Sequence, residues 1–80
     1  MLSFKVQNSG TGVSKGIQIA CDAEGMSVLL TALATLIGER ASHVHLCGPS
    51  AGGDALSETT PRGEEAVWEV VIDYAESGDQ

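Results

Sequence analysis

The sequence has few basic residues. Lys and Arg number four against eleven Asp and Glu among 80 residues, which gives a formal net charge of −7. A nucleic-acid surface needs clustered Lys and Arg to contact phosphates, so this scarcity argues against nucleic acid as a partner. An acidic chain is instead suited to remaining in solution, or to attracting a basic protein over long range.

Cysteines and long hydrophobic runs are also scarce. Cys21 and Cys47 are the two cysteines and form no Cys-x-x-Cys motif, which argues against a zinc site built on thiolates. The longest apolar run, 28–37, is interrupted by threonines and is too short to span a bilayer. No charged segment followed by an apolar run opens the chain, so we expect no export signal. We therefore expect a soluble, cytoplasmic protein with reduced thiols and no membrane partner.

The remaining composition is that of a small globular domain. Apolar residues make up 42% of the chain and charged residues 19%. A chain of this length supports one domain, which buries only about 60–65% of the surface of its unfolded state. We therefore expect a single domain over residues 1–80 of modest stability, and a homodimer is an open alternative.

Alternating apolar and polar residues predict four strands. They are expected at residues 2–7, 13 or 14–21, 43–47 and 66–74. A turn rich in Gly and Asn at 8–12 joins the first two as a hairpin. In the third strand Val44 and Leu46 point one way and the histidines the other. In the fourth, one face is expected to pack under a helix and carries Trp68, Val70, Ile72 and Tyr74, and the other carries Val67, Glu69, Val71 and Asp73.

One helix is predicted over residues 23–37. Asp22 is a typical N-cap, Glu24 suits the first turn, and Gly38 is suited to a left-handed C-terminal cap. Apolar residues recur at spacings of three, four and seven and predict one buried stripe, in which Met26 is a core residue. The stripe consists of Met26, Leu29, Leu30, Leu33, Leu36 and Ile37.

These elements predict an α+β domain of order β-β-α-β-β. We expect one four-stranded, mostly antiparallel sheet with the helix packed on one face. The connection at 48–65 is long for so small a domain, and Leu56 is expected to fix its middle to the core. The tail at 75–80 is expected to be frayed.

His43 and His45 lie two apart on a strand, so their side chains project on the same side, roughly 6.5–7 Å apart. If the third and fourth strands are neighbours, Glu69 or Asp73 lies beside them, and Cys47 follows on the same face. His43, His45 and Glu69 are therefore candidate metal ligands. Two histidines alone specify no metal, however, and we expect the pair to face solvent or a partner, with no cofactor bound.

No catalytic residues are predicted. Cys47 and His45 are close enough in sequence to meet on one face, but no third residue is placed to orient the imidazole. The loop at 48–53 lacks the Gly-Lys-Ser/Thr ending of a phosphate loop, so we interpret it as a tight turn. A non-enzymatic binding protein fits better than an enzyme. A small metal-binding or regulatory domain and an oligomeric structural module remain alternatives.

The order of short motifs resembles a family of bacterial immunity proteins from polymorphic toxin systems, the family catalogued as immunity protein thirty-two. The resemblance covers about residues 17–74 and rests on four segments: Asp22-Ala23-Glu24-Gly25, His43-x-His45-Leu46, Pro49-Ser50-x-Gly52-Gly53 and Leu56-Ser57-Glu58. It implies an α+β protein that binds and neutralises a cognate toxin and has no enzymatic activity. Ala51 stands where the family pattern has an aromatic residue, usually Trp, which removes an anchor of the kind that often dominates an interface.

The contact residues are inferred from their position rather than transferred from the family. We expect the third strand and the following loop to dock on a toxin with a basic surface. Acidic residues of the loop would supply charge, and the paired glycines would allow close backbone approach. The predicted contact residues are His43, His45, Ser50, Gly52, Gly53, Asp54 and Glu58.

Overall fold

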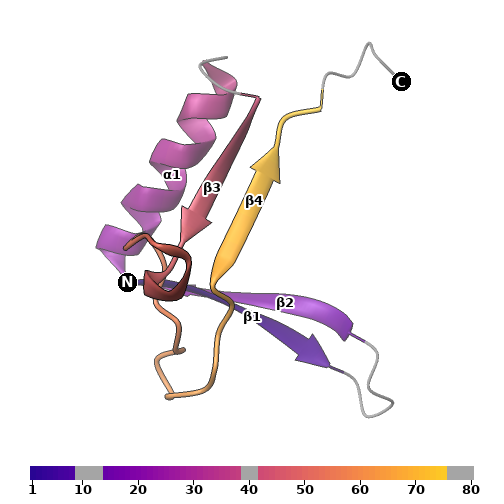
Figure 1. Ribbon diagram of the computed structural model, residues 1–80, viewed down its shortest axis with the longest axis vertical. Helices are drawn as coiled ribbons and strands as arrows, with labels where there is room; N and C mark the ends of the chain where they lie inside the picture. The colour runs from indigo at the N-terminus through magenta and orange to yellow at the C-terminus, as the bar shows by residue number, and fades with distance from the viewer. Residues whose placement is uncertain (9–13, 39–41, 76–80) are drawn as a thin grey trace.

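The computed structural model describes residues 1–8, 14–38 and 42–75, which form four strands and one α-helix in the order β-β-α-β-β (Figure 1). The predicted α+β class and element order are confirmed. Residues 9–12 of the predicted turn and 76–80 of the predicted tail lie outside the described residues. The elements are β1 (Leu2–Asn8), β2 (Ser14–Cys21), α1 (Ala23–Ile37), β3 (His43–Cys47), the 3₁₀ turn η1 (Pro49–Ala51) and β4 (Glu69–Asp73).

The strands form two separate two-stranded sheets, so the predicted single four-stranded sheet is wrong. β1 pairs with β2 antiparallel, with Leu2 opposite Cys21. β3 pairs with β4 antiparallel, with Cys47 opposite Glu69. In Figure 1 the β1–β2 hairpin runs across the molecule, and the second pair stands upright beside α1.

The long connection explains why the two sheets do not join. The Met1 carbonyl accepts a hydrogen bond from Asp22 N at the end of β2, 3.0 Å away. Because alternate carbonyls point to opposite edges of a strand, those of Leu2 and Phe4 lie on the other edge of β1. They accept from Ser57 N at 2.7 Å and Val67 N at 2.9 Å. The connection therefore occupies the edge where a third strand would pair.

This connection is itself folded. Ala55 N and Leu56 N both donate to the Cys47 carbonyl, at 3.0 and 3.1 Å, and Leu56 is 3% exposed within the core. The predicted anchoring by Leu56 is confirmed. A second turn follows at residues 60–63, closed by a 2.8 Å bond from Gly63 N to the Thr60 carbonyl, with Gly63 at a φ of 83°. Glycine adopts this left-handed conformation without strain.

The core lies where α1 crosses the two sheets. Its buried residues are Leu2, Phe4, Ala32, Leu46 and Leu56. The predicted N-cap is confirmed, because Asp22 Oδ1 accepts from Gly25 N at 2.9 Å and also contacts the amino group of Met1. Gly38 has a φ of −77°, so the predicted left-handed cap is wrong; its N–H still donates to the Ala34 carbonyl.

The apolar stripe of α1 divides in two. Leu36 is buried and Leu29 packs against the core, but Met26, Leu30, Leu33 and Ile37 are exposed, so the predicted core position of Met26 is wrong. The physical reason is that α1 is apolar on most of its circumference, while two small sheets cover only one side. Within the described ranges, no helix is long and apolar enough to cross a membrane.

The last strand is shorter than its alternating pattern predicts. Val70 and Ile72 pack against the core as expected, but Trp68 and Tyr74 are 58% and 50% exposed. Pairing with β3 ends at Glu69 and Asp73, so the two aromatic residues lie just outside the strand. Their predicted packing beneath the helix is therefore wrong.

Candidate functional site

The β3–β4 sheet has one core face and one outer face. Val44, Leu46, Val70 and Ile72 turn inward to the core shared with α1. Strand alternation then places six other side chains on the opposite side. We call this side the outer face, and it consists of His43, His45, Cys47, Glu69, Val71 and Asp73. Both histidines are exposed, as the sequence predicts.

Glu69 lies at the centre of the contacts on the outer face. Its Oε2 is 2.8 Å from His45 Nδ1 and 3.8 Å from Cys47 Sγ. The two imidazole rings meet edge to face, with centroids 5.0 Å apart, and Ser42 Oγ lies 3.3 Å from His43 Nδ1. The sequence left the order of the strands open; β3 and β4 are neighbours, with Asp73 opposite His43 and Glu69 bonded to His45.

The environment of Cys47 holds its thiol in the neutral form. Partial desolvation raises the pKa of Cys47, and the charge and hydrogen bond of Glu69 raise it further. A cysteine nucleophile requires the opposite shift, because the thiolate is the reactive species. The Cys47–Glu69 contact is therefore suited to hydrogen bonding rather than to nucleophilic attack.

The described part of the chain holds no group of three or more His, Cys, Asp or Glu side chains that could bind a metal ion. His45 and Glu69, two of the candidate ligands, contact each other directly. His43 stacks edge-on against His45. Metal binding by His43, His45 and Glu69 stays the alternative that the sequence left open, beside the prediction of a pair that faces solvent or a partner.

The segment from Gly48 to Glu58 folds into a compact lip at the end of β3. Glu58 holds it together, because its carboxylate accepts bonds from Ser50 N at 2.5 Å and Ser50 Oγ at 2.7 Å. Both bonds lower the pKa of Glu58 below its ordinary value of 4.5, and the bond from the Ser50 hydroxyl has the larger effect. Hydrogen bonds within the segment therefore hold the lip in a defined conformation.

Glycines allow the lip to close on the outer face. Gly52 has a φ of 87° and ends η1. A Cβ on Gly53 would lie 2.8 Å from Cys47 Cβ, and one on Gly48 would lie 2.8 Å from Glu58 Oε2. Two of these glycines are therefore needed for close packing, and the third for its backbone angle.

The predicted contact residues lie on two adjoining parts of the molecule, the outer face and the lip, and Asp54 of the lip lines a groove with Glu24 and Gly25 at the start of α1. Gly53 packs on Cys47, which joins the lip to the histidines of the outer face. His43, His45, Ser50, Gly52 and Asp54 are exposed. Glu58 differs, since it is partly buried and its charge is used within the lip.

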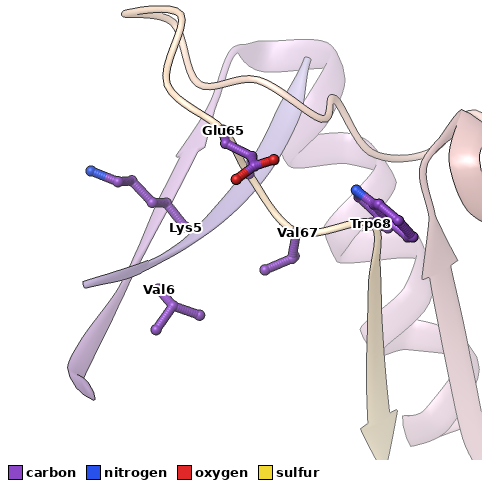
Figure 2. Close-up of a pocket in the computed structure, with 6 residues that line it drawn as sticks. Lys5, Val6, Glu65, Val67 and Trp68 are labelled. Carbon is purple, nitrogen blue, oxygen red and sulfur yellow. The ribbon is translucent and has the colours of Figure 1, made fainter. Parts of the chain in front are cut away.

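One feature next to the lip was not predicted. An open groove of about 530 Å³ is lined by Lys5, Val6, Glu65, Ala66, Val67 and Trp68. In Figure 2 the side chains of Lys5 and Trp68 lie at its two ends, with Glu65 and Val67 between them. The Trp68 carbonyl accepts a 2.7 Å hydrogen bond from Gly48 N. The Trp68 end of the groove therefore lies next to the first residue of the lip. The available signal was the chain's one tryptophan directly before a short strand.

Comparisons with family models, with curated proteins and with solved structures found no match. The resemblance to the immunity family therefore rests on the motif residues alone and stays a prediction.

Proposed function

We propose that this chain is an immunity-type protein that binds a bacterial toxin and neutralises it by occlusion. The contact surface is the outer face of β3–β4 together with the lip. The observation that carries the proposal is an exposed His45–Glu69 pair on a sheet face that the core does not use, directly beside a folded lip. Occlusion needs only a shaped surface that covers the toxin's own site, and the chain contributes no chemical step.

The charges of this surface favour a basic partner. Glu69, Asp73 and Asp54 are exposed on the outer face and the lip, within a chain of net charge −7. Complementary charge speeds encounter and discriminates among partners more than it adds affinity. Imidazoles add hydrogen-bonding groups with defined direction at the centre of the surface.

Trp68 supplies an aromatic residue at the edge of the lip. Ala51 stands where the immunity family pattern has an aromatic residue. Trp68 is 58% exposed, and its backbone is bonded to Gly48, the first residue of the lip. Tryptophan is enriched among the residues that dominate interface energies. We therefore place the main apolar contact at Trp68 rather than at position 51.

The proposal is tested with the protein encoded by the neighbouring gene as the candidate toxin. Titration calorimetry should show tight binding by the wild-type chain and at least about a tenfold weaker affinity for the double variant His43→Ala/His45→Ala and for Trp68→Ala. Thr31→Ala, on the opposite side of the sheet, is the matched control and should bind like wild type. Equal affinities for all four proteins would contradict the proposed surface, and failure of the wild-type chain to bind or protect cells would contradict the function.

A further inference from the structure

A second apolar surface lies on α1, on the flank of the helix next to its buried residues. Its large side chains are Met26, Leu30, Leu33 and Ile37, which are 52%, 59%, 37% and 81% exposed. The intervals of four, three and four residues keep them on one side of the helix over three turns. This is the spacing at which two helices pack side by side. We call these four residues the outer seam.

The outer seam lies in an uncharged part of an acidic chain. No residue from Gly25 to Gly38 carries an ionisable side chain. The solvent face of a helix in a small domain normally carries charged residues. Other exposed positions of α1 are small or polar, among them Ser27, Thr31 and Ala34. A second copy, itself of net charge −7, can approach this surface with little like-charge repulsion.

We propose that two copies of this chain associate through α1, with the helices antiparallel about a two-fold axis. The axis passes between positions 30 and 33, so Leu30 faces Leu33 of the second copy and Met26 faces its Ile37. An antiparallel pair also keeps Asp22 and Glu24 of the two copies at opposite ends, about 22–28 Å apart along the axis. A parallel pair would bring those four carboxylates together.

The size of the seam sets the strength of the association. A helix of 15 residues is about 22 Å long, so the pair buries less than the roughly 1,200 Å² of a standard interface. We therefore expect a reversible dimer with a dissociation constant in about the micromolar range. Because α1 covers the core face of β3–β4, the dimer leaves the outer face and lip free, and it does not depend on the proposed function.

Sedimentation equilibrium between about 10 µM and about 1 mM tests the dimer. The wild-type chain should shift from a mass of 8.2 kDa towards twice that value. Leu30→Glu should raise the dissociation constant at least about tenfold, whereas Thr31→Glu, which adds the same charge one position along, should not. Circular dichroism checks that both variants are folded, which is expected because both positions are exposed. A wild-type monomer throughout, or equal effects of both variants, would overturn the proposal.

Disulfide formation between introduced cysteines tests whether the two α1 helices of the dimer are antiparallel. In a Cys21→Ser/Cys47→Ser background, mixed Met26→Cys and Ile37→Cys proteins should oxidise to the heterodimer. Preferential homodimers of each variant would indicate parallel helices and overturn the antiparallel arrangement. If Leu30→Glu instead abolishes toxin binding by a monomeric chain, the seam belongs to the toxin and the self-association proposal fails.

Discussion

Glu58 shows how a single side chain shapes the candidate site. Sequence position alone assigned it to partner contact, as a charge on an exposed loop. The structure instead uses both of its oxygens to bind Ser50, directly above the buried Gly48. Such a role was not predictable, because it depends on how residues eight apart in sequence fold back on each other.

Replacing Glu58 tests whether it holds the lip together. Glu58→Gln puts an amide nitrogen where one oxygen accepts from Ser50, so we expect a lower melting temperature and faster amide exchange at residues 50–53. Asp54→Asn, which removes an exposed charge from the same lip, should leave both unchanged. Equal effects of the two variants would show that Glu58 acts through charge alone.

The same contact predicts a pH dependence. The pKa of Glu58 is lower in the folded chain than its ordinary value, because the Ser50 hydroxyl and amide stabilise the carboxylate. Such a group stabilises the fold above its ordinary pKa and loses this effect as the pH falls through that value towards the folded pKa. The melting temperature of wild type should therefore decrease from about pH 5 to about pH 3. The melting temperature of the Glu58→Gln variant should decrease less over the same pH range.

At the scale of elements, the ends of α1 were predictable and its orientation was not. Asp22 caps the helix as expected, because N-capping is a local interaction. Which apolar residues face inward depends on where the sheets lie, so Met26 and Leu29 were not distinguishable from spacing alone. The outward histidines of β3 were predictable, because strand alternation is local and Val44 and Leu46 occupy the core side.

Gly25 allows the first turn of α1 to pack closely against the backbone at the start of β1. A Cβ at this position would lie 1.8 Å from the Met1 carbonyl oxygen, well inside contact distance. Helix propensity alone would make Gly25→Ala about 1 kcal/mol more stable, but overpacking costs about 1–3 kcal/mol, occasionally more.

We expect a lower free energy of unfolding for Gly25→Ala in urea denaturation. Ser27→Ala, at an exposed position of the same helix, should change it by only a few tenths of a kcal/mol. A Gly25→Ala variant more stable than wild type would contradict the close packing of α1 on β1.

At the scale of the whole molecule, local patterns predicted the elements but not their assembly. Four strands suggested one sheet, yet bonds from Ser57 and Val67 to β1 place the long connection at the edge where the sheets would have joined. The groove beside Trp68 follows from the same arrangement, since Lys5 and Val6 of β1 form its other side. Contacts between residues some 50 or more positions apart leave no periodic signal in the sequence.

The resulting molecule presents two chemically different surfaces, one on β3–β4 with the lip and one on α1. The outer face and lip are polar and acidic, with exposed histidines and the neighbouring Trp68. The outer seam of α1 is apolar and uncharged. This division suits a protein that meets a basic partner on one side and its own copy on the other.

The outer face and the lip form the proposed toxin contact, and an NMR titration maps that contact residue by residue. The ¹⁵N-labelled chain is mixed with the unlabelled product of the neighbouring gene, and saturation transferred from the toxin is measured at each amide. We predict that the transfer is concentrated at residues 43–58 and 68–73 and is weak along 26–37. Transfer concentrated on the helix, with residues 43–58 unaffected, would show that the toxin binds elsewhere than at the outer face and the lip.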